Sequence, residues 1–150
     1  MRVQTEIELL QQIPLFAGVD PSHLQLLSFS AKRRRFAAGQ PILLKGETSR
    51  SAFLITGGRA SAHSGIDSKS PKLANIEVGN LVGELSMFVA KPQPVSVFAV
   101  QDVEAREITR ELFKRVSEEF PVFAKQVFAA LSQKLDQGLS DLDQLQRQFD

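Results

Sequence analysis

Hydrophobic positions follow a helical period at both ends of this chain and a strand pattern between them. A helix over residues 1–12 is predicted by apolar residues at helical spacing, Val3, Ile7 and Leu10. Asp20 and Pro21 predict the start of a second helix, because aspartate caps helices well and proline is favoured at the first helical position. This second helix is expected to bury Leu24, Leu27 and Phe29.

The middle of the chain is a series of short apolar runs separated by glycine or polar turns. The expected strands cover residues 36–39, 41–44, 52–55, 59–63, 72–78, 95–100 and 103–108. Short strands at this close spacing predict an antiparallel sandwich or barrel.

The C-terminal part returns to helical spacing. Thr109 is the expected N-cap of a helix over residues 110–118, and Phe120-Pro121 restarts a long helix over 121–149. Apolar residues in that helix alternate at steps of three and four, with Gly138 at one seam position: Phe128, Leu131, Leu135, Leu142, Leu145 and Phe149. Such a seam predicts a coiled-coil homodimer, and the alternative is a helix packed on its own domain.

Composition limits the function classes. The chain has 150 residues, 43% hydrophobic content, a net charge of +1 and no cysteine, which favours one globular domain without disulfides or thiolate metal sites. No apolar run approaches the ~18 residues of a membrane span, so we expect a cytoplasmic protein without membrane contact. The run Lys32–Arg35 is interpreted as a solvated strand edge, with a nucleic-acid patch as the alternative. A jelly-roll metal site would need two or three histidines and a carboxylate at short spacing. The chain has only His63 and, about forty residues away, His23, so it offers too few ligands.

The stretch from Val78 to Val100 carries the strongest motif. Gly83-Glu84-Leu85-Ser86-Met87-Phe88 is followed by a three-residue spacer and Pro92-Gln93-Pro94-Val95-Ser96-Val97. This resembles the phosphate-binding cassette of the cyclic-nucleotide-binding domain family, G-E-[LI]-[AS]-L-L, three residues, then P-R-[AS]-A-[TS]-V. A second match, to the first half of the family's β-roll, runs through Phe36, Gly39, Ile42, Gly46, Glu47, Phe53, Ile55 and Gly58.

The resemblance implies a mostly β fold with flanking helices: an antiparallel double-stranded β-helix, or jelly-roll-like β-roll, with N-terminal helices and a long C-terminal helix. The whole chain, 1–150, would be one domain, with entry helices over 1–30, the β-roll over 31–108, the cassette within it at 79–97, and C-terminal helices over 109–150. In this family the last helix pairs two subunits and covers the nucleotide, which places the expected dimer interface on Phe128, Leu131, Leu135, Leu142 and Leu145.

The resemblance also implies a ligand site for cAMP or cGMP, without a further cofactor. Glu84 would accept from the ribose 2′-hydroxyl and Gly83 would allow close backbone approach. The expected ligand-binding residues are Gly83, Glu84, Leu85, Ser86, Gln93, Pro94, Val95 and Ser96. Gln93 replaces the family's phosphate-binding arginine, and Pro94 lacks the N–H that should follow it. We therefore expect weak nucleotide binding.

Two functions follow as hypotheses. The first is a stand-alone regulatory sensor that binds a cyclic nucleotide and signals through a dimer to an unknown effector protein. The second is a degenerate member that binds no nucleotide and serves as a protein–protein interaction module. Catalysis is not expected, because no nucleophile–base pair or metal cluster is evident. Direct DNA binding is not expected either, because no reader motif follows the last helix and the net charge is small.

Overall fold

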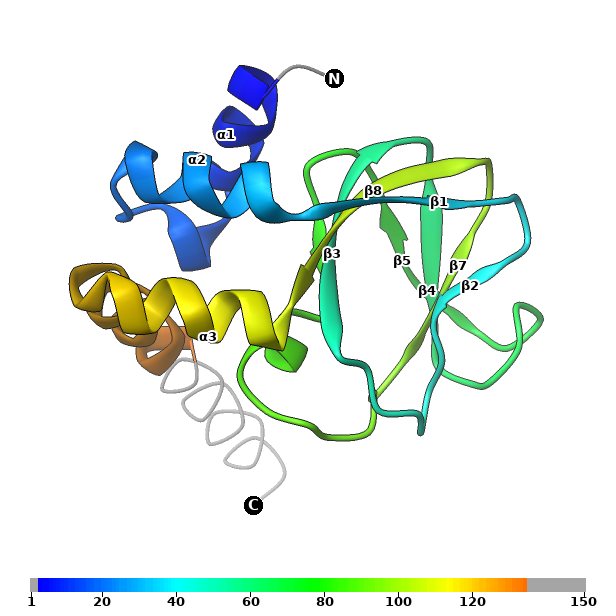
Figure 1. Cartoon of the computed structure of the whole chain (residues 1–150). Coiled ribbons are helices and arrows are strands. Elements are labelled where there is room, and N and C mark those ends of the chain that lie inside the picture. Colours follow the sequence, from blue (N-terminus) through cyan, green and yellow to red (C-terminus); the bar gives the residue numbers. More distant parts are fainter. Residues whose placement is uncertain (1–2, 135–150) are drawn as a thin grey trace, which may run out of the picture.

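The computed structural model describes residues 3–134 (Figure 1). Helices gather on one side and strands on the other. In chain order the elements are α1 (Val3–Gln11), the 3-10 helix η1 (Pro14–Phe16), α2 (Pro21–Ser30), β1 (Lys32–Phe36), β2 (Pro41–Leu43), β3 (Ser51–Gly57), β4 (Ala60–His63), β5 (Lys72–Ile76), β6 (Leu81–Val82), the 3-10 helix η2 (Glu84–Met87), β7 (Ser96–Ala99), β8 (Val103–Thr109), α3 (Arg110–Glu119) and a helical segment over residues 121–134.

The strands form two antiparallel four-stranded sheets, in the orders β1-β8-β3-β6 and β2-β7-β4-β5. Strands distant in sequence are neighbours: β1 pairs with β8 in a register that sets Lys32 opposite Glu107 and Phe36 opposite Val103. This is the predicted jelly-roll-like β-roll with flanking helices. Of the predicted long C-terminal helix, residues 121–134 are helical, and residues 135–150 lie outside the described part.

Two apolar clusters lie on opposite faces of β3 and β8, because successive side chains of a strand point to opposite sides. Ala52, Leu54 and Ile108 pack with the helices. Phe53, Ile55 and Ala105 pack between the two sheets. The first sheet therefore separates a helical layer from the core of the β-roll.

Side-chain caps fix where two helices begin, as predicted. Asp20 Oδ1 accepts from the N–H of Ser22 at 2.8 Å and from its hydroxyl at 2.7 Å. These hydrogen bonds, the hydroxyl's first, lower the pKa of Asp20 below its usual range. Thr109 Oγ1 accepts from the N–H of Leu112 at 3.0 Å at the start of α3.

A buried ion pair ties α1 to the first sheet. Glu6 is 2% exposed, and its Oε1 accepts from Nε of Arg106 on β8 at 2.8 Å. Its Oε2 accepts from the hydroxyl of Ser28 on α2 at 2.6 Å. One carboxylate thus joins two helices and a strand.

Several details differ from the prediction. Phe29 is 78% exposed, because the buried stripe of α2 runs through Leu24, Leu27 and Ser28, and the next residue falls on the solvent side. Residues 37–39 form a turn rather than a strand. The two-residue strand β6 was not predicted, since it is too short to show an alternating pattern. Within the described residues, no helix combines the length and the apolar character needed to cross a membrane.

Candidate functional site

The cassette begins at a backbone turn that requires glycine. Gly83 follows β6 and has φ of +70°, in the left-handed region. A Cβ at this position would lie 3.0 Å from Cδ1 of Leu43 and 3.4 Å from the carbonyl oxygen of Ser51. Both conformation and space therefore favour glycine where the chain turns into η2.

The short helix η2 begins with free N–H groups and contains the carboxylate residue Glu84. The N–H groups of Glu84 and Leu85 lie in its first turn, where a helix has no carbonyl of its own to offer them. The Glu84 side chain is largely buried, and Nζ of Lys134 donates to its Oε1. This contact was not predictable from the sequence, because Lys134 lies 50 residues from Glu84, in the helical segment over residues 121–134.

Gln93, at the position where the resemblance implies an arginine, makes an internal hydrogen bond. Its Nε2 donates to Oγ of the buried Ser86 at 2.8 Å. Its backbone bonds to the β2–β3 loop, with the N–H donating to the carbonyl of Glu47 and the carbonyl accepting from the N–H of Gly46, both at 2.9 Å. The side chain of Gln93 is thus tied to η2, and its backbone is tied to the β2–β3 loop.

Arg110, the first residue of α3, was not foreseen as part of this site. Its Nε donates to the carbonyl of Ser86 at 2.9 Å, and its guanidinium also donates to the carbonyls of Ser49 and Val89, at 2.9 and 3.3 Å. A cation in the first turn opposes the helix dipole. This unfavourable position in the first turn of α3 was the one signal in the sequence that Arg110 makes its contacts with other segments.

The remaining predicted site residues differ in their exposure. Leu85 and Pro94 are exposed and Val95 is half-buried. Ser96 is fully buried, and its Oγ accepts from the N–H of Lys45 at 2.9 Å. Gly83, Glu84, Ser86 and Gln93 therefore gather around η2, whereas the Ser96 hydroxyl holds the β2–β3 loop.

A cavity of about 280 Å³ lies on the loop side of Gln93. Leu43 and Ser51 line it, and so do the carboxylate residues Glu47 and Glu107. Glu107 is paired with Arg34, and the remaining charges of the lining are Glu47 and the cation Arg50. The cavity therefore offers no excess positive charge for a phosphate. The N–H groups of η2 are the better candidates for that role.

His63 is satisfied without a metal. Its Nε2 lies 2.7 Å from Oγ of Ser61 and its Nδ1 lies 2.9 Å from the carbonyl oxygen of Ser70. Over residues 3–134, no three histidine, aspartate or glutamate side chains are grouped so that they could hold a metal ion.

The helical segment over residues 121–134 contains two of the predicted interface residues, Phe128 and Leu131. Phe123 and Val127 in this segment are completely buried in the apolar cluster between the helices and the first sheet, and Leu131 is half-buried against that cluster. Phe128 is 50% exposed and its ring centroid lies 5.7 Å from that of Phe88. Leu135, Leu142 and Leu145 lie outside the described residues.

Comparison with known proteins decides the family. The model of the cyclic nucleotide-binding domain matches residues 33–120, which include the cassette and most of the β-roll. The chain belongs to the cyclic nucleotide-binding domain family. The residues named above for the cassette all fall within the matched region.

Relatives of this family member include regulators from bacteria and fungi. The Cyclic AMP receptor protein of Thermus thermophilus is 27% identical over 133 residues, covering 88% of this chain and 62% of that protein. A cAMP-dependent protein kinase regulatory subunit of Hypocrea atroviridis is 25% identical over 107 residues, covering 71% of this chain and 22% of the subunit. The chain thus spans less than two thirds of either relative.

A solved structure supports the fold. The N-terminal domain of a transcriptional regulator from Streptomyces coelicolor A3(2) superposes with a TM-score of 0.81 at 22% identity, covering 89% of this chain and 93% of that one. At this identity the likeness establishes the β-roll with its flanking helices and no more.

Proposed function

We propose that this chain is a regulatory sensor domain that binds cAMP or cGMP weakly at its cassette, without catalysis. The observation that carries the proposal is the left-handed turn at Gly83, after which η2 begins at Glu84 with its first N–H groups free of a helical partner. Such N–H groups suit a phosphate, and a carboxylate suits a ribose hydroxyl. Membership of the family supports the same assignment.

Weak binding follows from the two departures in the cassette. Gln93 offers a neutral amide in place of a charged fork, and that amide already donates to Ser86. Pro94 has no N–H. A hydrogen bond to a charged group contributes roughly 1.5–3 kcal/mol, so losing one lowers affinity about 10- to 150-fold.

The test restores the missing donors. The double variant Gln93→Arg, Pro94→Ala should bind cAMP or cGMP at least tenfold more tightly than the native chain by calorimetry. Gln101→Arg, on an exposed turn away from the cassette, adds the same charge and should change nothing. Adding Glu84→Ala to the double variant should remove much of the gain, because the ribose hydroxyl loses its acceptor.

Signalling through a homodimer to an effector protein is the second part of the proposal. The half-exposed Phe128 supports it, as does the heptad seam in the sequence. Changing Leu135 and Leu142 to Lys should yield a monomer in sedimentation while the β-rich circular dichroism persists. An unchanged mass would assign the helix to its own subunit.

A second candidate function is an interaction module without a nucleotide. The internal bonds Gln93–Ser86 and Lys134–Glu84 favour it, because the side chains of Gln93 and Glu84 are already partnered within the chain. If the restored double variant binds nucleotide no better than the native chain, the interaction module is the correct function.

A further inference from the structure

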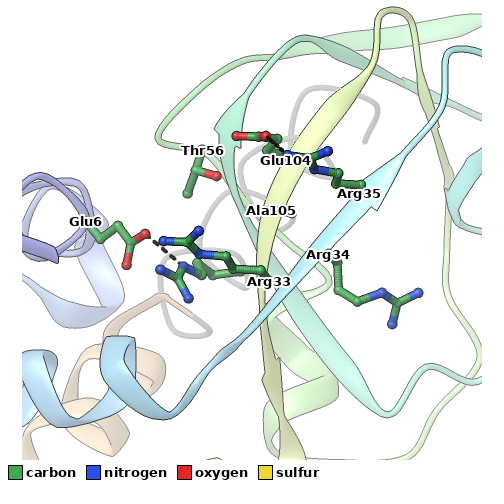
Figure 2. A pocket seen from close by; sticks show the side chains of 8 residues that line it. Glu6, Arg33, Arg34, Arg35, Thr56, Glu104 and Ala105 are labelled. Carbon is green, nitrogen blue, oxygen red and sulfur yellow. Dashed lines mark hydrogen bonds and ion pairs between the residues drawn. The ribbon is translucent and has the colours of Figure 1, made fainter. Parts of the chain in front are cut away.

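A small cationic cleft lies between α1 and the first sheet, away from the cassette (Figure 2). Its volume is about 60 Å³. The polar side chains that line it on the side facing α1 are those of Glu6, Arg33, Arg35, Thr56, Glu104 and Arg106. Such a volume holds a few water-sized groups. The cleft therefore has room for one small oxyanion and not for a nucleoside.

The charges in this cleft are not balanced by its own residues. Arg106 pairs with Glu6, and Arg35 pairs with Glu104 at 3.2 Å. Within residues 3–134, Arg33 makes no ion pair. The cleft thus keeps one uncompensated positive charge.

The position of Arg33 makes that charge costly. Arg33 lies directly opposite Arg106 in the β1–β8 ladder, and like charges facing each other across strands destabilise a sheet. Arg34 also borders the cleft, but Figure 2 shows its side chain pointing away from Glu6, and its NH1 donates to Glu107 at 2.9 Å. An anion between Arg33 and Arg106 would convert the repulsion into two attractions.

One wall of the cleft is fixed in advance. The Arg106 guanidinium is held by Glu6 through Nε and donates from NH1 to the carbonyl of Ala31 at 3.3 Å. Its NH2 takes part in neither bond. Thr56 adds a hydroxyl donor to the lining. A rigid guanidinium, a second guanidinium and a hydroxyl match the oxygens of a tetrahedral anion.

We propose that this cleft binds a phosphate group, as inorganic phosphate or as the end of a small phosphomonoester, independently of the nucleotide site. Arg33 and Arg106 would hold the phosphate oxygens, with Thr56 donating a third hydrogen bond. The contact would also strengthen the attachment of α1 to the sheet, because Arg106 carries the Glu6 ion pair.

The test titrates the full chain with inorganic phosphate at constant ionic strength, using chloride to balance, and follows backbone amides by NMR. Saturable shifts are expected at Arg33, Thr56 and Arg106. Arg33→Gln should weaken binding at least tenfold. Arg34→Gln removes the same charge from the next residue of the strand, on its other face, and should leave the affinity unchanged.

A second variant and a second probe keep the outcome clear. Thr56→Val preserves charge and shape and should weaken binding about two- to tenfold. Glycerol 3-phosphate binding more tightly than phosphate would identify a phosphomonoester as the ligand, and equal affinity would identify the free anion. Equal weakening by Arg33→Gln and Arg34→Gln, or shifts confined to Glu84 and Leu85, would overturn the proposal.

Discussion

Removing one partner of the Glu6–Arg106 ion pair should cost far more stability than removing both. Glu6 is 2% exposed, and the Arg106 side chain is 12% exposed. Breaking a buried pair leaves an uncompensated charge and typically costs about 3–5 kcal/mol, whereas replacing both partners with apolar groups is often nearly neutral. We expect Arg106→Met to be the costlier single change, because it strands the more deeply buried carboxylate with Ser28 alone.

A double-mutant cycle measures this coupling. Glu6→Leu, Arg106→Met and the double variant would be unfolded in urea, and we expect a coupling energy of about 2 kcal/mol or more. Arg35 and Glu104 provide the matched control on the same sheet face: their side chains are 86% and 55% exposed, so their coupling should not exceed about 1 kcal/mol. A Glu6–Arg106 coupling as small as the control's would refute the reasoning.

Two further predictions concern single side chains. Lys134→Ala should raise nucleotide affinity up to about fivefold, because it frees the largely buried Glu84 from its ion pair with the exposed Lys134. Lys125→Ala is the neutral control. Lower affinity by calorimetry would instead make Lys134 a ligand contact. The lowered pKa of Asp20 means that its cap stabilises the fold above the unfolded pKa of about 3.9 and loses that effect as pH falls through the folded pKa. Asp20→Asn should therefore lose stability less steeply than the native chain below about pH 4 in urea titrations, and identical slopes would contradict the assignment.

The sequence predicted those features that depend on neighbouring residues. Asp20 and Thr109 cap their helices because a cap needs only a side-chain oxygen two or three residues from the free N–H. Strand spacing predicted an antiparallel sandwich or barrel, and the family resemblance of the motif at Gly83 implied the jelly-roll-like β-roll that the structure has. The dimer seam and the roles of the ligand-binding residues stay predictions.

Features that join distant residues were not predictable from the sequence. Glu6 reads as a polar position of a surface helix, and its partner lies 100 residues away. Lys134 meets Glu84 across 50 residues. Phe29 was wrongly assigned to the core because apolar character alone does not say which side of a helix faces the sheet. In each case the three-dimensional packing, rather than local propensity, decides the contact.

The position of β3 and β8 between two apolar clusters has a consequence for hydrogen exchange. Leu54 and Ile108 face the helices while Ile55 and Ala105 face the β-roll, so these strands are protected from both sides. Opening the helical layer alone leaves their amides covered by the second sheet, and opening the β-roll alone leaves the helices in place. Their amides should exchange only in the largest openings of the domain, whereas those of the edge strand β5, with four of its five residues exposed, should exchange in small local ones.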